Sequence, residues 1–245
     1  LPEAARQTIR KAILEKGIQP SLDAGQGLFR GTSNWSQVCN AGITMGALAV
    51  MEDRPELAHS IVHRAVNGIQ VIMNKYEPDG AYPEGPGYWD YGTTYNVLLL
   101  AALESVLGTD FALSQKTGFS RAAEYYLHVC GPTGMNFNYP DARPGKSFTP
   151  AVFWFAKTYD RPQLAWNEYR LLQQALPDNP RPITANRMSP LTMLWASGDA
   201  VKPEQTAWLG RGSNPVALFR TAWTPDAVFL GFKGTDTHGL KAFKR

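Results

Sequence analysis

The residues best suited to chemistry lie in a loop that is rich in glycine, proline and aromatic side chains. Residues 79–92 read Asp-Gly-Ala-Tyr-Pro-Glu-Gly-Pro-Gly-Tyr-Trp-Asp-Tyr-Gly. Such a segment is poorly suited to a core, because regular ladders cannot satisfy its backbone and because its rings carry polar tips. It is well suited to the floor of a cleft that stacks on sugar rings and holds phenol hydroxyls near a reacting bond.

Three tyrosines in and after this loop, Tyr88, Tyr91 and Tyr95, recur at spacings that place them on one face of a helix. A stack of core tyrosines is the alternative, and we favour it for Tyr95. Tyr88 follows Pro-Gly where the loop enters the helix, so its hydroxyl can stand in open space. A phenol, with an ordinary pKa near 10, can protonate a leaving oxygen, or accept a proton if a cation favours its phenolate. Glu84 is a candidate to orient a sugar hydroxyl or to pair with a cation, although an exposed loop glutamate is the commoner case.

A second group of polar residues opens a helix further upstream. Asn34, Gln37 and Asn40 share a helix face by their spacing. Asn34 stands at a good N-cap position, and a simple cap is one interpretation. Amides at the start of a buried helix, with the positive end of its dipole behind them, also suit a bound carboxylate. The residues alone leave both interpretations open.

These motifs must be positioned by helices. The hydrophobic periodicity alternates between helices that are apolar nearly all round and helices with a single apolar stripe. The 35–51 and 89–107 segments are of the first, inner type, and Gly42 and Gly46 predict close helix contacts in the first of them. The 55–76 segment is of the second, outer type. The further helices expected are 2–16, 120–129, 149–159, 162–175 and 190–196.

This inner–outer order is what an α/α toroid, an incomplete barrel of helical hairpins, would produce, and a simple bundle is the alternative. After residue 200 the pattern changes to short runs rich in β-branched and aromatic residues, at 207–209, 216–223 and 227–233. We therefore predict a mainly α fold. A toroid domain would span residues 1–203, and residues 204–245 would hold the opening strands of an antiparallel β-sandwich domain, incomplete in this chain.

Composition narrows the functional classes. The net charge of +3 is small and no basic run resembles a nucleic-acid arm, so a nucleic-acid partner is not expected. No apolar run approaches the roughly 20 residues that span a bilayer. The two cysteines, Cys39 and Cys130, are better explained as buried thiols than as a disulfide. We predict no metal site and no cofactor, apart from a structural metal that the rest of the β domain could hold.

Together the motifs resemble one enzyme class. The stretches NWSQVCNAG at 34–42 and DGAYPEGPGYWDYGTTY at 79–95, with FLGFKG at 229–234, are similar to the heparinase II/III-like superfamily of polysaccharide lyases. The likeness covers roughly residues 30 to 235. It implies an α/α toroid followed by an antiparallel β sandwich, a cleft at their junction, and a periplasmic or secreted location. It also implies an acidic polysaccharide partner, and leaves the oligomeric state open.

The resemblance implies β-elimination on a uronic-acid polysaccharide. Asn34 would neutralise the C6 carboxylate and so acidify the C5 proton. Tyr88 would be the catalytic acid or base, with Tyr91 the second choice. His238 would be a remnant of a histidine that relatives carry in the second domain, while Trp35 replaces a histidine that several relatives carry after the asparagine. The residues expected to contact substrate are Gln37, Asn40, Tyr82, Glu84, Trp89 and Tyr95.

Two other classes remain open. An α/α-toroid glycoside hydrolase would need two carboxylic acids flanking the bond, and Glu84 and Asp90 are available. A carbohydrate-binding protein that kept the fold and lost the chemistry is the alternative that is not an enzyme.

Overall fold

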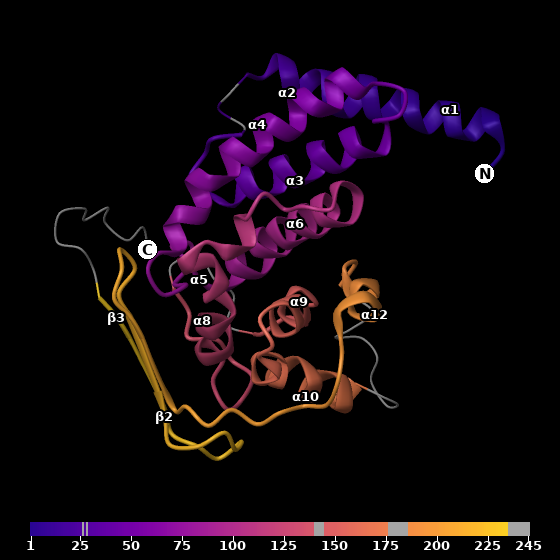
Figure 1. The fold of residues 1–245 in the computed structure, drawn as a ribbon. Coiled ribbons are helices and arrows are strands. Elements are labelled where there is room, and N and C mark those ends of the chain that lie inside the picture. Colours follow the sequence, from indigo (N-terminus) through magenta and orange to yellow (C-terminus); the bar gives the residue numbers. More distant parts are fainter. Residues whose placement is uncertain (26, 28, 140–144, 176–185, 235–245) are drawn as a thin grey trace. The chain divides into compact units, whose positions relative to one another are not determined.

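The computed structural model describes residues 1–25, 27, 29–139, 145–175 and 186–234. They form two compact units: unit 1 comprises Leu1–Asn74 and Tyr95–Gln115, and unit 2 comprises Lys75–Thr94 and the residues from Lys116 onward. The chain is mainly helical, with one three-stranded antiparallel sheet toward its C-terminal end (Figure 1). The expected mainly α class and the change to strands after residue 200 are thus confirmed. The domain boundary between residues 203 and 204 stays a prediction.

Unit 1 is built from helices. Its elements are α1 (Glu3–Ala12), the π-helical η1 (Ile13–Ile18), α2 (Gln19–Asp23), α3 (Asn34–Ala49), α4 (Pro55–Met73), α6 (Thr94–Leu107, apart from its first residue) and the 3-10 turn η5 (Leu113–Gln115).

The α3 and α4 helices lie against each other, and the apolar stripe of α4 explains why (Figure 1). Ile61, Ala65 and Ile69 of that stripe are fully buried, which confirms the expected stripe. In α3, a Cβ at Gly46 would stand 3.3 Å from the Ile13 side chain, so a close contact is confirmed there. At Gly42 nothing lies within 4 Å of such a Cβ, and the close contact expected there is wrong.

Unit 2 contains shorter helices and the sheet. Its helical elements are the end of η3 (Asn74–Tyr76), α5 (Gly85–Tyr88), the π-helical η4 (Trp89–Thr93), α7 (Thr117–Ser120), α8 (Ala122–Val129), α9 (Ala151–Thr158), η6 (Pro162–Ala165), α10 (Trp166–Ala175), η7 (Ser189–Leu191) and α12 (Thr192–Trp195). Its strands are β1 (Ala207–Gly210), β2 (Val216–Arg220) and β3 (Phe229–Lys233).

The core of unit 2 is aromatic. Phe119 packs edge-on against Tyr76 at 5.4 Å and in a tilted arrangement against Phe155 at 5.2 Å, measured between ring centroids. Gly118 is required next to this cluster, because a Cβ there would come within 2.4 Å of the Tyr76 carbonyl carbon. Ring packing and this close backbone approach together fix the chain that leads into the 79–92 loop.

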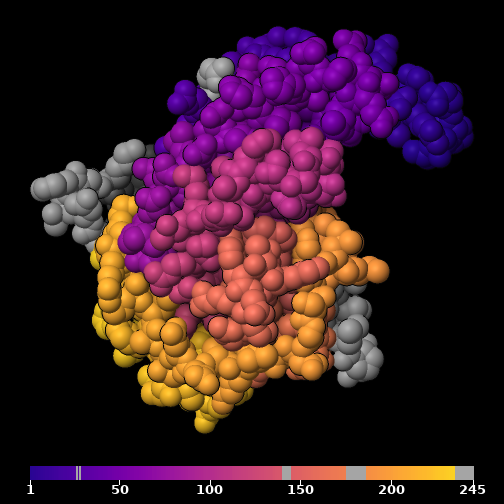
Figure 2. Space-filling view, in the orientation of Figure 1, coloured from indigo at the N-terminus to yellow at the C-terminus, as the bar shows by residue number. Residues whose placement is uncertain are grey.

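The three strands pair in sequence order, β1–β2–β3, and present two different faces. One face contacts α8 and buries Trp208, Val216 and Leu218. The other face is apolar but exposed. Phe219 lies opposite Leu230 on this outer face, and Phe232 contacts Phe219 edge-on at 6.4 Å. Figure 2 shows the strand residues, in yellow, at the surface of unit 2.

Several helix boundaries differ from expectation. The 89–107 segment begins as a helix at Gly85 and passes through the π-helical η4 before α6. The 120–129 segment is divided at Arg121 into α7 and α8. The 2–16 segment passes into the π-helical η1. The β2 and β3 strands are shorter than predicted because the 221–228 segment forms a turn, closed by the Thr221 N–H donating to the Val228 carbonyl at 3.1 Å, whereas β1 extends one residue further, to Gly210.

Candidate functional site

The 79–92 loop is anchored to unit 2 at its start. Asp79 is buried and its carboxylate accepts a hydrogen bond from the Arg211 N–H at 2.5 Å. Gly80 adopts a positive φ of 95°, and a Cβ there would lie 2.5 Å from the Arg121 carbonyl oxygen. Only glycine meets both conditions, since other residues rarely adopt this backbone and would collide. The loop is therefore held in place before it reaches the tyrosines.

Tyr88 and Tyr91 stand exposed at the point where the loop becomes helical. Tyr88 ends α5 and is 37% exposed, and Tyr91 within η4 is 42% exposed. A π-helical turn is rare and is frequently found at functional sites. The expectation that the Tyr88 side chain is accessible at a loop-to-helix junction is confirmed.

Trp89, between these two tyrosines, points the other way. It is fully buried and stacks on Tyr126, with the ring centroids 4.0 Å apart and the planes at 10°. It also packs against Phe155 at 5.9 Å. In this structure the indole therefore anchors the exposed tyrosines to the core, and both of its neighbours are protein rings.

The other two loop residues expected to contact substrate interact with each other. Tyr82 is fully buried, and its hydroxyl donates to the carboxylate of the half-buried Glu84 at 3.1 Å. Burial, together with the nearby Tyr76 and Glu84, raises the pKa of Tyr82 well above its ordinary range. Tyr82 therefore stays a neutral donor that positions Glu84.

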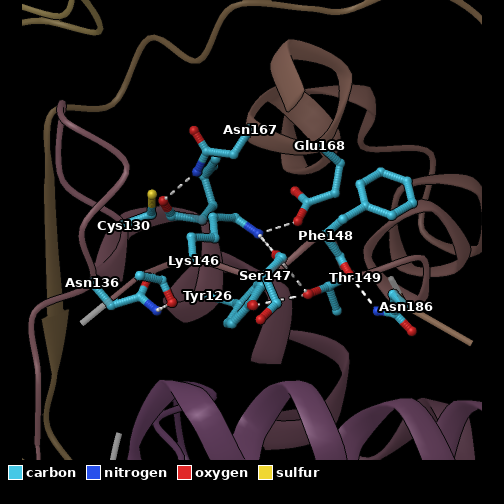
Figure 3. A network of polar contacts seen from close by, with 12 residues as sticks. Tyr126, Cys130, Asn136, Lys146, Ser147, Phe148, Thr149, Asn167, Glu168 and Asn186 are labelled. Atoms are coloured by element: carbon cyan, nitrogen blue, oxygen red, sulfur yellow. Dashed lines mark hydrogen bonds and ion pairs between the residues drawn. The ribbon is translucent and has the colours of Figure 1, made fainter. Parts of the chain in front are cut away.

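Asp90 connects the tyrosine segment to a polar network inside unit 2 through Thr149 and Lys146. Figure 3 shows the part of this network around Lys146, Thr149 and Glu168. Burial raises the pKa of Asp90 to about 6, while a hydrogen bond from Thr149 and the charge of Lys146 oppose the rise. The Thr149 hydroxyl also shares a hydrogen bond with the Tyr126 hydroxyl at 2.9 Å. The ring that stacks on Trp89 thus belongs to the same network as the Asp90 side chain.

The centre of this network is an ion pair between Lys146 and Glu168. The two side chains are 3% and 1% exposed. The Lys146 ammonium also donates to the Ser147 carbonyl at 3.0 Å and lies 4.5 Å from the centroid of the Tyr126 ring. Burial raises the pKa of Glu168, and the Lys146 charge opposes this. Inside a protein such a pair is costly unless it is fully hydrogen-bonded, which makes it a candidate for a specific role.

Sequence reasoning missed Lys146, Thr149 and Glu168. One signal was available for Glu168, which follows the buried Leu164 by four residues and so falls on the apolar face of the 162–175 segment. An acid in that position calls for a buried partner. Lys146 carries no comparable signal, because it lies in a segment without regular periodicity.

The polar row near the start of α3 belongs to unit 1. Asn34 is the first residue of α3 and Ser33 takes the N-cap position, so the interpretation of Asn34 as the cap is wrong. Asn34, Gln37 and Asn40 are all buried. The Gln37 amide donates to the side-chain oxygen of Asn96 at 3.2 Å.

Asn40 has a structural role within this row. Its amide donates to the Phe29 carbonyl at 2.9 Å and to the Ser36 carbonyl at 2.7 Å. It therefore fastens the loop before α3 to the helix itself. Tyr95 lies in α6 and is half-buried.

The expected site residues thus form two groups. Unit 2 brings together the loop residues Tyr82, Glu84, Tyr88, Trp89 and Tyr91, and unit 1 holds the amides of α3 with Tyr95. The approach of the Asn34 amide to the Tyr88 hydroxyl stays a prediction. His238 lies outside the described residues.

Within the described part of the chain, no group of three or more His, Cys, Asp or Glu residues could hold a metal ion. Within the same residues, no helix is both long and apolar enough to cross a membrane. In comparisons with known proteins, no protein-family model and no curated protein matches this chain.

Proposed function

We propose that this chain is a polysaccharide lyase that cleaves a uronic-acid-containing polysaccharide by β-elimination. The observation that carries the proposal is Tyr88, an exposed phenol that directly precedes a π-helical turn and whose next residue, Trp89, is buried in the core of unit 2. A catalytic group needs an accessible reactive atom on a rigid support, and Tyr88 has both.

In the proposed reaction Asn34 donates hydrogen bonds to the C6 carboxylate of the uronate. This stabilises the enolate-like charge that develops when a tyrosine or histidine removes the C5 proton. The electron pair of the C5–H bond becomes the C4–C5 double bond, and the C4–O4 bond breaks. Tyr88 gives its proton to the departing O4. Tyr91 is the second candidate for this proton transfer.

We further propose that the helices belong to an α/α toroid and that the strands open a β sandwich, as in the heparinase II/III-like superfamily. The pairing of α3 with α4 supports helical hairpins. The exposed apolar outer face of the sheet, with Phe219, Leu230 and Phe232, supports a sandwich, because such a face is normally covered by a second sheet. A periplasmic or secreted location goes with this family.

The test is the ultraviolet absorbance of the unsaturated product, measured with alginate, heparan sulfate, hyaluronan and polygalacturonate. We expect one of these polymers to give a rise that Tyr88→Phe lowers by about 10²- to 10⁴-fold, the usual contribution of a positioned proton donor. Tyr169→Phe is the matched control, because the Tyr169 hydroxyl donates to a backbone carbonyl, that of Ser197 at 3.0 Å. If none of the acidic polymers gives a rise in absorbance, the lyase proposal is refuted.

A glycoside hydrolase is the second candidate, and the raised pKa of Asp90 favours it. A carboxyl group with a pKa near 6 can act as a general acid at neutral pH. A hydrolase would release reducing ends without an unsaturated product. It would also lose far more activity with Asp90→Asn or Glu84→Gln than with Tyr88→Phe, whereas the lyase predicts the reverse order.

A further inference from the structure

A basic cleft runs along α4 in unit 1. It is an open cavity of about 590 Å³ lined by Arg30, Ser60, His63, Arg64, Asn67 and Gly68. Ser60, Arg64 and Gly68 follow one another at intervals of four residues, as do His63 and Asn67, so these five share one face of the helix. Arg30 comes from the loop that precedes α3. The cleft therefore lies between a helix face and a loop.

The loop is fixed against the helix by the residue before Arg30. Phe29 is fully buried, and its carbonyl accepts hydrogen bonds from the Ser36 hydroxyl at 3.1 Å and the Asn40 amide at 2.9 Å. A Cβ at Gly68 would come within 2.4 Å of this same carbonyl oxygen, so glycine is needed for the close approach. Arg30 is thus held at the edge of the cleft by a rigid backbone.

The charge in the cleft is unbalanced. Arg64 is half-buried, with its guanidinium carbon 4.9 Å from the centroid of the Phe29 ring, and its Nη1 is buried with no hydrogen-bond partner in the described chain. In the described residues neither Arg30 nor Arg64 forms an ion pair. Among the described residues, no carboxylate lines the cavity. A partly desolvated cation without a counter-charge is unfavourable, and a bound anion would remove that cost.

We propose that this cleft binds an oxyanion, a carboxylate or a sulfate, carried by an acidic polysaccharide. The choice of a polysaccharide rests on the proposed function, whereas the oxyanion follows from the two guanidinium groups. Guanidinium binds such groups in a bidentate manner, and its orientation here is set by the Phe29 ring. The cleft would therefore hold the polymer independently of any residue that moves protons.

Isothermal titration calorimetry with two polymer fragments tests this and separates the two sources. Oligogalacturonate carries only carboxylates, a dextran sulfate fragment carries only sulfates, and neutral dextran is the control. For Arg64→Gln and for Arg30→Gln we expect affinity for at least one acidic fragment to fall about tenfold, as for a lost charge-assisted hydrogen bond. Arg54→Gln, which removes an exposed arginine outside the cleft, should leave the affinity unchanged.

Two cleft variants are used so that the test remains valid if one of them misfolds. Arg30 is an exposed loop residue, so its replacement keeps the test valid even if Arg64→Gln destabilises unit 1. The proposal is overturned if neither acidic fragment binds, if both cleft variants bind like the wild type, or if Arg54→Gln weakens binding equally. Binding that depends on the cleft arginines, without an unsaturated product, would support the oxyanion site and refute the lyase activity. An unsaturated product, with unchanged binding in both cleft variants, would support the lyase activity and refute the oxyanion site.

Discussion

The ion pair between Lys146 and Glu168 permits a quantitative test of the polar network in unit 2. Lys146→Met keeps most of the apolar stem and removes the ammonium group. Because the two side chains are only 3% and 1% exposed, solvent cannot replace the lost charge. Glu168 must then be protonated in order to stay buried, since an unpaired carboxylate in the interior is far more costly.

The free-energy cost of protonating Glu168 sets the size of the destabilisation expected for Lys146→Met. An unfolded glutamate has a pKa of about 4.3, and each pH unit above it adds about 1.4 kcal/mol to the cost of holding the proton. At pH 7 the destabilisation should therefore approach about 4 kcal/mol, and at pH 5 it should be about 1 kcal/mol. The destabilisation grows with pH because the folded-state pKa of Glu168 is raised. Its protonated form favours the folded state, and that contribution is lost as the pH rises.

Urea unfolding at pH 5 and pH 7 measures these differences for the wild type, Lys146→Met, Glu168→Gln and the double variant. The double variant should lose less than the two single variants together, because it leaves no unpaired charge. Equal losses for Lys146→Met at the two pH values, or strict additivity in the double variant, would refute the reasoning.

Three further predictions concern other contacts. Burial raises the folded-state pKa of Asp90 to about 6, so the stability that this group contributes below about pH 4 is lost as the pH rises through 6. Asp90→Asn should remove this pH-dependent loss of up to about 3 kcal/mol. A variant whose thermal melting depends on pH as in the wild type would contradict this prediction. Gly118→Ala should cost about 1–3 kcal/mol because its Cβ meets the Tyr76 carbonyl at 2.4–2.5 Å, whereas Gly42→Ala should stabilise α3 slightly; similar melting shifts for both would contradict the packing. Arg220→Met should cost about 1–3 kcal/mol in urea unfolding, because two backbone carbonyls lose a buried donor at 2.7 and 2.9 Å, and a loss below about 0.5 kcal/mol would show that these bonds matter little.

The helices that carry the candidate site could be predicted from local patterns. The apolar stripe of α4 and the long apolar run of α6 fixed their type and approximate bounds, because burial of one helix face leaves a regular spacing in the sequence. The β-branched and aromatic runs after residue 200 predicted β1, β2 and β3 in the same way. The loop-to-helix junction correctly predicted that Tyr88 is exposed.

Local sequence patterns could not predict which of two adjacent side chains is exposed and which is buried. Tyr88 and Trp89 are adjacent aromatics, yet one is exposed and the other stacks on Tyr126, 37 positions further on (126 − 89). The π-helical η4 begins at Trp89, directly after Tyr88, and no residue in the loop specifies a π turn by itself. The same holds for the Asp90 carboxyl, whose raised pKa comes from surroundings supplied by distant segments.

The sequence by itself thus determined the helical and strand elements, the Gly/Pro-rich loop and the supply of phenols and amides, because these depend on neighbours within one or two turns. Only the tertiary structure decided the buried pair of Lys146 and Glu168, the anchoring of Trp89 and the unbalanced arginines beside Phe29. Each of these joins residues from separate segments, and burial alone turns an ordinary charge into one that must find a partner.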